Sequence, residues 1–302
     1  AQPASRHDFR IGFHFWKPGK IYDEAYQGVV DGLALEAIRY KSFIFNANRD
    51  EALARKNLKT LDGMGLDLIV SFSSAGTKIA QSMQLRTPLI ATVVNHPMVL
   101  GIQKEEEANG SSITGTSYYV DAEQHLLFYR EMFPRLSRVD MIYDTNNPAG
   151  FQAEEPLMRK ACERLGLVFL SEGIVGKKDL PTAAQALADA KADIIVIPTN
   201  RQVYANLQNV LDITHAHQIP VVSMNKQGVE YGALAALFAD TYKLGRLMAP
   251  IAGQILIDKK KPAEIPFKFI AQPDLIINLK EARNLDYEFN PSILGKASIV
   301  LD

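Results

Sequence analysis

The chain has 302 residues, which is long for one domain and comfortable for two. Apolar residues make up 47% and charged residues 22%, an ordinary globular balance, and no stretch is long and apolar enough to predict a membrane-spanning helix. A formal net charge of −1 without a basic block argues against nucleic acid as a partner, and the single cysteine excludes an intramolecular disulfide.

The compartment is left open by the composition. The first residues, AQPASRHD, are polar, contain no signal peptide, and look like the start of a mature secreted chain or an artificial end. Cys162 lies at helical spacing with Met158 and Leu165 and is predicted to fill a core. A chain without paired cysteines is compatible with both the cytosol and the periplasm.

The first part of the chain alternates short apolar strands with helices. Residues 22–38 illustrate the helical pattern, because their apolar and aromatic side chains recur at positions 22, 25, 26, 29, 30, 33 and 37. Such an alternation predicts a parallel sheet that helices cover on both faces. Strands are predicted at residues 9–15, 41–47, 66–72 and 87–94, and helices at residues 22–38, at residues 50–64 and up to Met83.

The same order of elements then starts again. DLIVSFSS (Asp67 to Ser74) and DIIVIPTN (Asp193 to Asn200) are predicted to be equivalent strands in two similar lobes. The expected fold class is therefore α/β, with two doubly wound parallel-sheet lobes joined by a hinge. In the second half, strands are predicted at residues 138–144, 167–173, 193–199 and 219–225, and helices at residues 154–165, 180–190 and 203–215.

Ligands of open parallel sheets bind beyond the carboxyl ends of the strands, near a topological switch point, where helix N-termini offer free N–H groups. Most segments that follow the predicted strands are rich in Ser, Thr, Asn or Gly. These residue types also cap helices and form turns without any ligand. The six segments are FWKPG (15–19), SSAGT (73–77), NHP (95–97), NNPAGF (146–151), TNRQ (199–202) and NKQG (225–228).

Five longer segments, in this order and spacing, are similar to those of a known family. They are DLIVSFSSAGTKIAQ, PLIATVVNHPMVLGI, SSITGTSYYVD, DIIVIPTNRQV and GALAALFADTYKLGRLMA. From Ile11 to about Asn290 the chain resembles the ABC transporter substrate-binding proteins that bind tryptophan and related aromatic amino acids. The resemblance implies the type I periplasmic binding protein fold, a small ligand trapped between two lobes, and delivery of that ligand to the membrane subunits of an ABC transporter.

The resemblance also implies where the chain passes between lobes. Residues 8–116 and 230–265 are assigned to lobe 1, and residues 117–229 and 266–302 to lobe 2. Crossings are expected near residues 115–119, 228–232 and 266–273. Such lobes can hinge on a few residues, and a ligand that contacts both shifts the population toward the closed form.

The chain departs from the family at three polar positions. Asn95 and Asn200 stand where the family usually has Asp, and Asn147 stands near a family Glu. An amino acid's ammonium group, buried without a carboxylate partner, is costly. We therefore expect a neutral or carboxylate-bearing ligand. The alternative, the family's usual aromatic amino acid, needs another acid at the site, with Asp121, Glu230 and Asp240 as candidates.

Aromatic residues beside the same segments suit a ligand with an apolar or ring portion. Two of these residues have an alternative interpretation without a ligand. Trp16, the only tryptophan, could simply cover the strand end, and His96 could be a turn residue before a proline. The predicted ligand-binding residues are Trp16, Ser73, Ser74, Asn95, His96, Tyr118, Asn147, Phe151, Asn200, Arg201 and Asn225.

Motifs for catalysis are missing from the sequence. It has no GxGxxG after the first strand, no GxSxG, no HExxH and no CxxC, so we expect no enzyme, no cofactor and no metal site. A monomeric, periplasmic or extracytoplasmic solute receptor is the main hypothesis. A ligand-sensing domain of a signalling receptor is the alternative. A cytosolic regulator core is disfavoured, because only eight residues precede Phe9.

Overall fold

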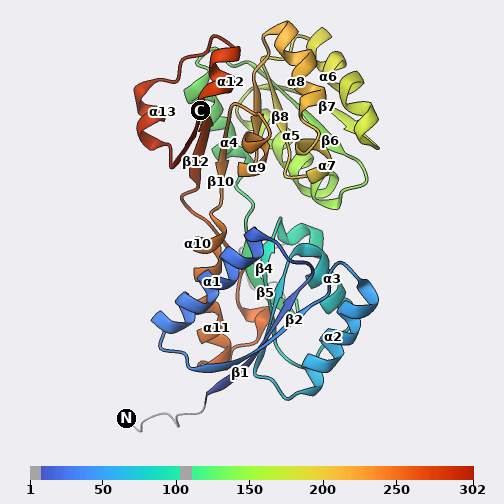
Figure 1. Ribbon diagram of the computed structural model, residues 1–302, viewed down its shortest axis with the longest axis vertical. Helices are drawn as coiled ribbons and strands as arrows, with labels where there is room; N and C mark the ends of the chain where they lie inside the picture. Colours follow the sequence, from blue (N-terminus) through green and yellow to red (C-terminus); the bar gives the residue numbers. More distant parts are fainter. Residues whose placement is uncertain (1–7, 103–110) are drawn as a thin grey trace. The chain divides into compact units, whose positions relative to one another are not determined.

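The computed structural model describes residues 8–102 and 111–302 and divides into two compact units. We call them lobe 1, which runs up to Tyr119 and includes Asp240–Ala271, and lobe 2, which comprises Val120–Ala239 and Gln272–Asp302. Residues 1–7, in the polar segment at the start of the chain, lie outside the described residues. Each lobe is a sheet with helices on both faces, which confirms the predicted fold class (Figure 1).

The lobe boundaries differ from those expected. The chain leaves lobe 1 after Tyr119, returns after Ala239 and leaves again after Ala271. The first and third positions lie within the expected crossings. The assignment of residues 230–239 to lobe 1 is corrected, because β10 (Ala235–Phe238) pairs with strands of lobe 2. Residues 266–271 belong to lobe 1, because β11 (Lys268–Phe269) pairs with β5 (Ile113–Ser117) of that lobe.

Lobe 1 contains a six-stranded parallel sheet with the order β11-β5-β4-β3-β1-β2. Its remaining strands are β1 (Phe9–Phe15), β2 (Tyr40–Asn46), β3 (Leu68–Phe72) and β4 (Leu89–Val94). Its helices are α1 (Lys20–Leu35), α2 (Glu51–Gly63), α3 (Ser74–Ser82), the 3₁₀ helix η1 (Pro97–Leu100), α10 (Thr241–Arg246), α11 (Met248–Leu256) and the 3₁₀ helix η5 (Pro262–Glu264).

The side chains of β1 alternate between the two faces of this sheet, as those of a strand must. Ile11, Phe13 and Phe15 belong to the core cluster with α1 and α11. His14 therefore points to the opposite face, beside Ser71 of the neighbouring strand β3. It is fully buried, so the lobe places a titratable ring inside its sheet–helix packing.

Lobe 2 contains a seven-stranded sheet with the order β13-β12-β10-β9-β8-β6-β7, parallel except between β10 and β12. Its remaining strands are β6 (Arg138–Asp144), β7 (Val168–Ile174), β8 (Ile194–Ile197), β9 (Val221–Ser223), β12 (Asp274–Asn278) and β13 (Ile299–Leu301). Its helices are α4 (Ala122–Met132), the π-helix η2 (Gly150–Glu154), α5 (Glu155–Arg164), η3 (Lys177–Asp179), α6 (Leu180–Asp189), α7 (Arg201–Tyr204), α8 (Gln208–Thr214), η4 (His215–His217), α9 (Lys226–Glu230), α12 (Leu279–Asn284) and α13 (Pro291–Lys296).

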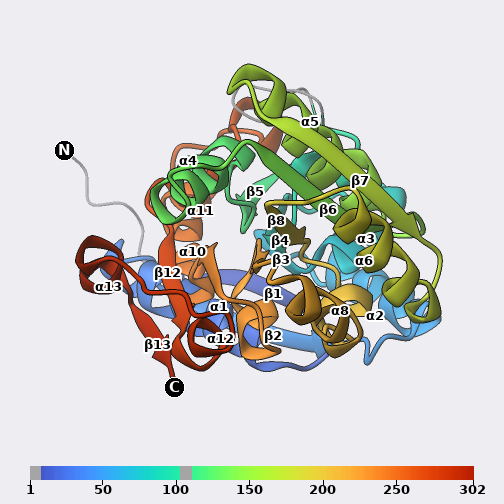
Figure 2. The same cartoon turned by 90° about the horizontal axis from the view of Figure 1, so that it is seen from above.

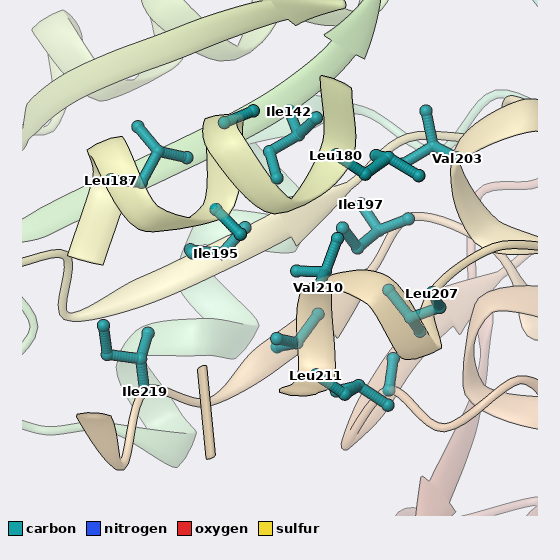
Figure 3. Close-up of a cluster of buried hydrophobic side chains, with 14 of the residues drawn as sticks. Ile142, Leu180, Leu187, Ile195, Ile197, Val203, Leu207, Val210, Leu211 and Ile219 are labelled. Atoms are coloured by element: carbon teal, nitrogen blue, oxygen red, sulfur yellow. The ribbon is translucent and has the colours of Figure 1, made fainter. Parts of the chain in front are cut away.

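One face of this sheet packs on α6 and α8, whose Leu and Val side chains interleave with Ile195 and Ile197 of β8 (Figure 3). Cys162 is buried in α5, and burial raises the pKa of its thiol to about 12, as suits a core side chain. The helix predicted over residues 203–215 is instead two helices, α7 and α8. Between them the Asn206 side chain donates to the Gln202 carbonyl at 2.8 Å, a local bond that competes with helix continuation.

The repeated Asp has the same structural role in both lobes. Asp67 Oδ2 accepts from the Arg10 amide at 2.8 Å, and Asp193 Oδ2 accepts from the Arg138 amide at 2.8 Å. In each lobe the Asp directly precedes the third strand, and its carboxylate binds the backbone at the start of the first strand. The two strands are neighbours in the sheet, since β1 pairs with β3 and β6 with β8. The repeated sequence is thus a sheet clamp at the amino-terminal edge, away from the carboxyl ends of the strands.

Candidate ligand-binding faces

Each lobe has one topological switch point. In lobe 1 the chain places β2 on one side of β1 and β3 on the other; in lobe 2 it places β7 and β8 on either side of β6 (Figure 2). Loops that leave the two central strands in opposite directions open a crevice at the carboxyl edge. The candidate faces are therefore the ends of β1 and β3 in lobe 1, and of β6 and β8 in lobe 2.

At the switch point of lobe 1, Trp16 lies beside the N-terminus of α3. A methyl group added at Gly76, in the first turn of α3, would come 3.2 Å from Trp16 Cβ. Ser73 is the N-cap of this helix and accepts from the Gly76 amide at 3.1 Å; its own φ is +93°, in the region that favours glycine. Trp16 is partly buried, with its carbonyl accepting from the Arg49 amide at 2.8 Å. A ring and a helix N-terminus thus share one edge.

Asn95 connects three strand ends of the same lobe. Its amide donates to the Ser74 hydroxyl at 3.1 Å, and its carbonyl accepts from the Ser117 hydroxyl. These bonds join the start of α3, just after β3, to the ends of β4 and β5. The side chain of Asn95 is buried there, close to the backbone that it organises.

His96 and Tyr118 complete the face of lobe 1. His96 Nδ1 accepts from the Met98 amide at 3.1 Å, so the neutral ring carries its hydrogen on Nε2. The turn interpretation of His96 is thus confirmed, and its ring also packs edge-on against Tyr119 at 4.7 Å between centroids. Tyr118 is partly buried against the core of lobe 1 and donates its amide to Val94 at 2.9 Å.

At the switch point of lobe 2, Asn200 and Asp144 are joined across the two strand ends. Asn200 Nδ2 donates to Asp144 Oδ2 at 3.0 Å, and Asn200 Oδ1 caps α7 by accepting from the Gln202 amide at 2.6 Å. Asp144 Oδ1 accepts from the Asn146 amide at 2.8 Å. Asp144, the last residue of β6, is only 6% exposed. A carboxylate therefore stands at the centre of this face.

The π-helix Gly150–Glu154 follows directly. Asn147 Oδ1 accepts from the Gly150 amide at 3.3 Å at its start. The π-helix leaves Phe151 42% exposed and buries Glu154, which accepts from the amide of Thr199 at 3.1 Å and from its hydroxyl. Single π-turns within helices are frequent at functional sites.

The remaining predicted residues of lobe 2 begin short helices. Asn225 caps α9 by accepting from the Gly228 amide at 2.7 Å, and Arg201 is the exposed first residue of α7. Lys226, the first residue of α9, lies 3.8 Å from Glu230 one helical turn away. It is thus partly neutralised within its own helix.

The structure places two acidic residues at the face of lobe 2 that the expectation about the ligand's charge did not include. Asp144 and Glu154 were both overlooked, although Asp144 ends the predicted strand RVDMIYD. The acids considered instead have other roles. Asp121 caps α4, Asp240 caps α10, and Glu230 pairs with Lys226. The signal for Asp144 was its position as the final residue of the strand next to the switch point.

The predicted residues thus separate into two groups. Trp16, Ser73 and Ser74 lie with Asn95, His96 and Tyr118 along the edge of lobe 1. The others, Asn147, Phe151, Asn200, Arg201 and Asn225, lie along the edge of lobe 2. Within the described ranges 8–102 and 111–302, no cluster of three or more His, Cys, Asp or Glu could hold a metal ion, and no helix has the length and apolarity to cross a bilayer.

Comparisons with known proteins agree with this geometry. The family model described as ABC transporter substrate binding protein matches residues 18–301. A tyrosine-binding protein of Clostridioides difficile is 24% identical over 74% of this chain, and the match spans only 64% of that protein's length.

Solved structures with the same fold include the following two. One is an ABC domain in complex with L-Trp from Streptococcus pneumonia, with a TM-score of 0.77 and 21% identity, covering 98% of this chain and 100% of that one. Another is the ligand-free, open structure of a substrate binding protein with adhesive properties from Clostridium difficile, with a TM-score of 0.84 and 22% identity, covering 97% and 99%. On the family match over nearly its whole length, the chain belongs to the ABC transporter substrate binding proteins.

Proposed function

We propose that this protein is an extracytoplasmic solute receptor, which binds a small ligand with an aromatic or apolar body and delivers it to the membrane subunits of an ABC transporter. The family match supports this class of function. The observation that carries the proposal is that each switch point holds a ring side chain: Trp16 lies beside the capped N-terminus of α3, and Phe151, 42% exposed, lies in the π-helix that follows β6.

We further propose that the ligand carries an amino group, contrary to the expectation from the sequence. Asp144 supplies the carboxylate that a buried ammonium requires. Its oxygens accept from Asn146 and Asn200, and a carboxylate has about four acceptor positions, so capacity remains for a ligand N–H. Glu154 supports this arrangement by fixing Thr199, the residue before Asn200. The tyrosine-binding relative supports the same ligand class.

A neutral or carboxylate-bearing ligand remains the second candidate. Arg201 favours it, because this exposed cation is the first residue of α7, beside the cap Asn200. A carboxylate there would gain both the guanidinium and the helix N-terminus. The two candidates differ only in which charge the face of lobe 2 neutralises.

Calorimetric titration separates them. Wild-type protein is titrated with L-tyrosine, L-tryptophan and L-phenylalanine, and with their deaminated acid analogues. Binding of the amino acids but not of the analogues is expected, and Asp144→Asn should abolish it while the exposed Asp189→Asn leaves it unchanged. Binding of the analogues alone, with loss in Arg201→Gln, would establish the second candidate. Binding of neither set would refute an aromatic ligand.

A further inference from the structure

A buried polar chain in lobe 2 lies behind the loop that carries Asn225. The hydroxyl of Tyr129, in α4, donates to the carbonyl of Ser223 at 3.2 Å, and Tyr129 is fully buried. Because a carbonyl only accepts, the single hydroxyl hydrogen is committed to this bond. The Tyr129 oxygen must then accept from His125 Nδ1, which lies at 3.4 Å.

This assignment fixes the form of His125. Its ring carries the hydrogen on Nδ1, and burial keeps it neutral by lowering its pKa to about 3. His125 is fully buried, and its Nε2 has no hydrogen-bond partner within the described part of the chain. The ring thus contributes a donor aimed at Tyr129.

Ser223 connects the hydrogen bond of Tyr129 to the candidate ligand face. Its hydroxyl oxygen accepts from the Asn225 amide at 3.2 Å, and Asn225 in turn caps α9 at Gly228. A methyl group added at Gly228 would come 2.0 Å from the Ser223 hydroxyl oxygen, so the first turn of α9 rests directly on this side chain. A continuous set of contacts therefore runs from α4 to α9.

We infer that Tyr129 is a positioning residue for ligand binding, held by His125, which fixes the end of β9 and with it Asn225 and the N-terminus of α9. This inference rests on the proposed function for its effect on ligand affinity. The positioning itself is a property of lobe 2 alone. Losing the one hydrogen bond should loosen the loop without removing any group from the ligand face.

The test compares two tyrosines of the same lobe. Tyr287 also donates its hydroxyl to a backbone carbonyl, that of Met132, at 2.9 Å. Amide hydrogen exchange is measured on wild type, Tyr129→Phe and Tyr287→Phe. For Tyr129→Phe we expect exchange in residues 225–230 to be about five-fold faster, the change that loss of one hydrogen bond gives, and for Tyr287→Phe we expect these residues to keep wild-type rates.

Two variants of His125 add a graded readout. His125→Asn retains an N–H donor near the Nδ1 position and should keep exchange in α9 near wild type, whereas His125→Leu should reproduce the Tyr129→Phe result. Unchanged exchange in Tyr129→Phe, or equal acceleration in both tyrosine variants, overturns the positioning role.

Ligand affinity forms a separate arm, with L-tyrosine as the probe. Tyr129→Phe should weaken its binding about five-fold, matching the opening of the loop, while Tyr287→Phe retains it. Unchanged affinity alongside faster exchange would overturn the connection to ligand binding. If wild type binds none of L-tyrosine, L-tryptophan and L-phenylalanine, the ligand class in the proposed function fails, and hydrogen exchange still decides the positioning role.

Discussion

Acid should destabilise lobe 1 through His14, and replacing this residue should remove a defined part of that effect. Burial lowers the pKa of His14 from 6.5 to about 4, and both ring nitrogens are buried without a hydrogen-bond partner among the described residues. The unfolded chain therefore binds a proton near pH 6.5, whereas the folded chain stays neutral until about pH 4. Stability is fully present above pH 6.5 and falls as the pH drops toward 4.

The size of the effect follows from the two pKa values. Between pH 7 and pH 5, protonation of the His14 ring in the unfolded state costs the folded state about 2 kcal/mol. His14→Leu cannot take up this proton, so its loss of stability over the same interval should be smaller by about 2 kcal/mol. Because the comparison is between two pH values of one variant, any change in packing cancels.

The assay is urea unfolding at pH 7 and pH 5, followed by the fluorescence of Trp16. As the only tryptophan, it reports on lobe 1. Phe13→Leu, at a fully buried position on the same strand, is the control: it should lower the free energy of unfolding equally at both pH values. If His14→Leu loses as much stability between pH 7 and pH 5 as wild type does, the argument from burial is refuted.

Three further results are expected. Gly228→Ala should destabilise lobe 2 by about 1–3 kcal/mol in thermal unfolding, because its methyl group meets the Ser223 hydroxyl oxygen at 2.0 Å, whereas Gly295→Ala, with open space around it, should not. Asp193→Asn should cost about 1–2 kcal/mol in urea unfolding, because the carboxylate that binds the start of β6 loses its charge; an unchanged midpoint would contradict the clamp. Ligand should shift the emission of Trp16; an emission that never moves, with full affinity in Trp16→Phe, would make this residue structural.

The central strands of both lobes could be predicted because each is a short apolar run with a clear start. The strands predicted at residues 9–15 and 138–144 have the observed bounds. Both segments are flanked by polar residues, and both strands pair with a neighbour on each side. The run GALAALF gave no such indication. This segment forms β10, which pairs antiparallel with β12. The strand therefore depends on a partner far along the chain, which no local pattern predicts.

The candidate faces were predictable in outline but not in chemistry. Capping was the stated alternative for the polar loops, and Ser73, Asn200 and Asn225 are caps. Whether they also bind ligand stays a prediction. Asp144 was missed because its importance comes from the strand order, which brings the ends of β6 and β8 together. A sequence shows that a residue ends a strand, but not which strand lies beside it.

The three crossings of the chain also decide how the protein can fold. The core of lobe 1 combines Ile11 and Phe13 with Met248 and Ile251, which come from opposite ends of the sequence. Lobe 2 needs β12 and β13, which lie far from β6 in the sequence. Native contacts at such sequence separation form slowly, because the closure of a long loop must precede them. Neither lobe can be completed before these later residues are available, and in the proposed extracytoplasmic function this delay would keep the chain unfolded for export.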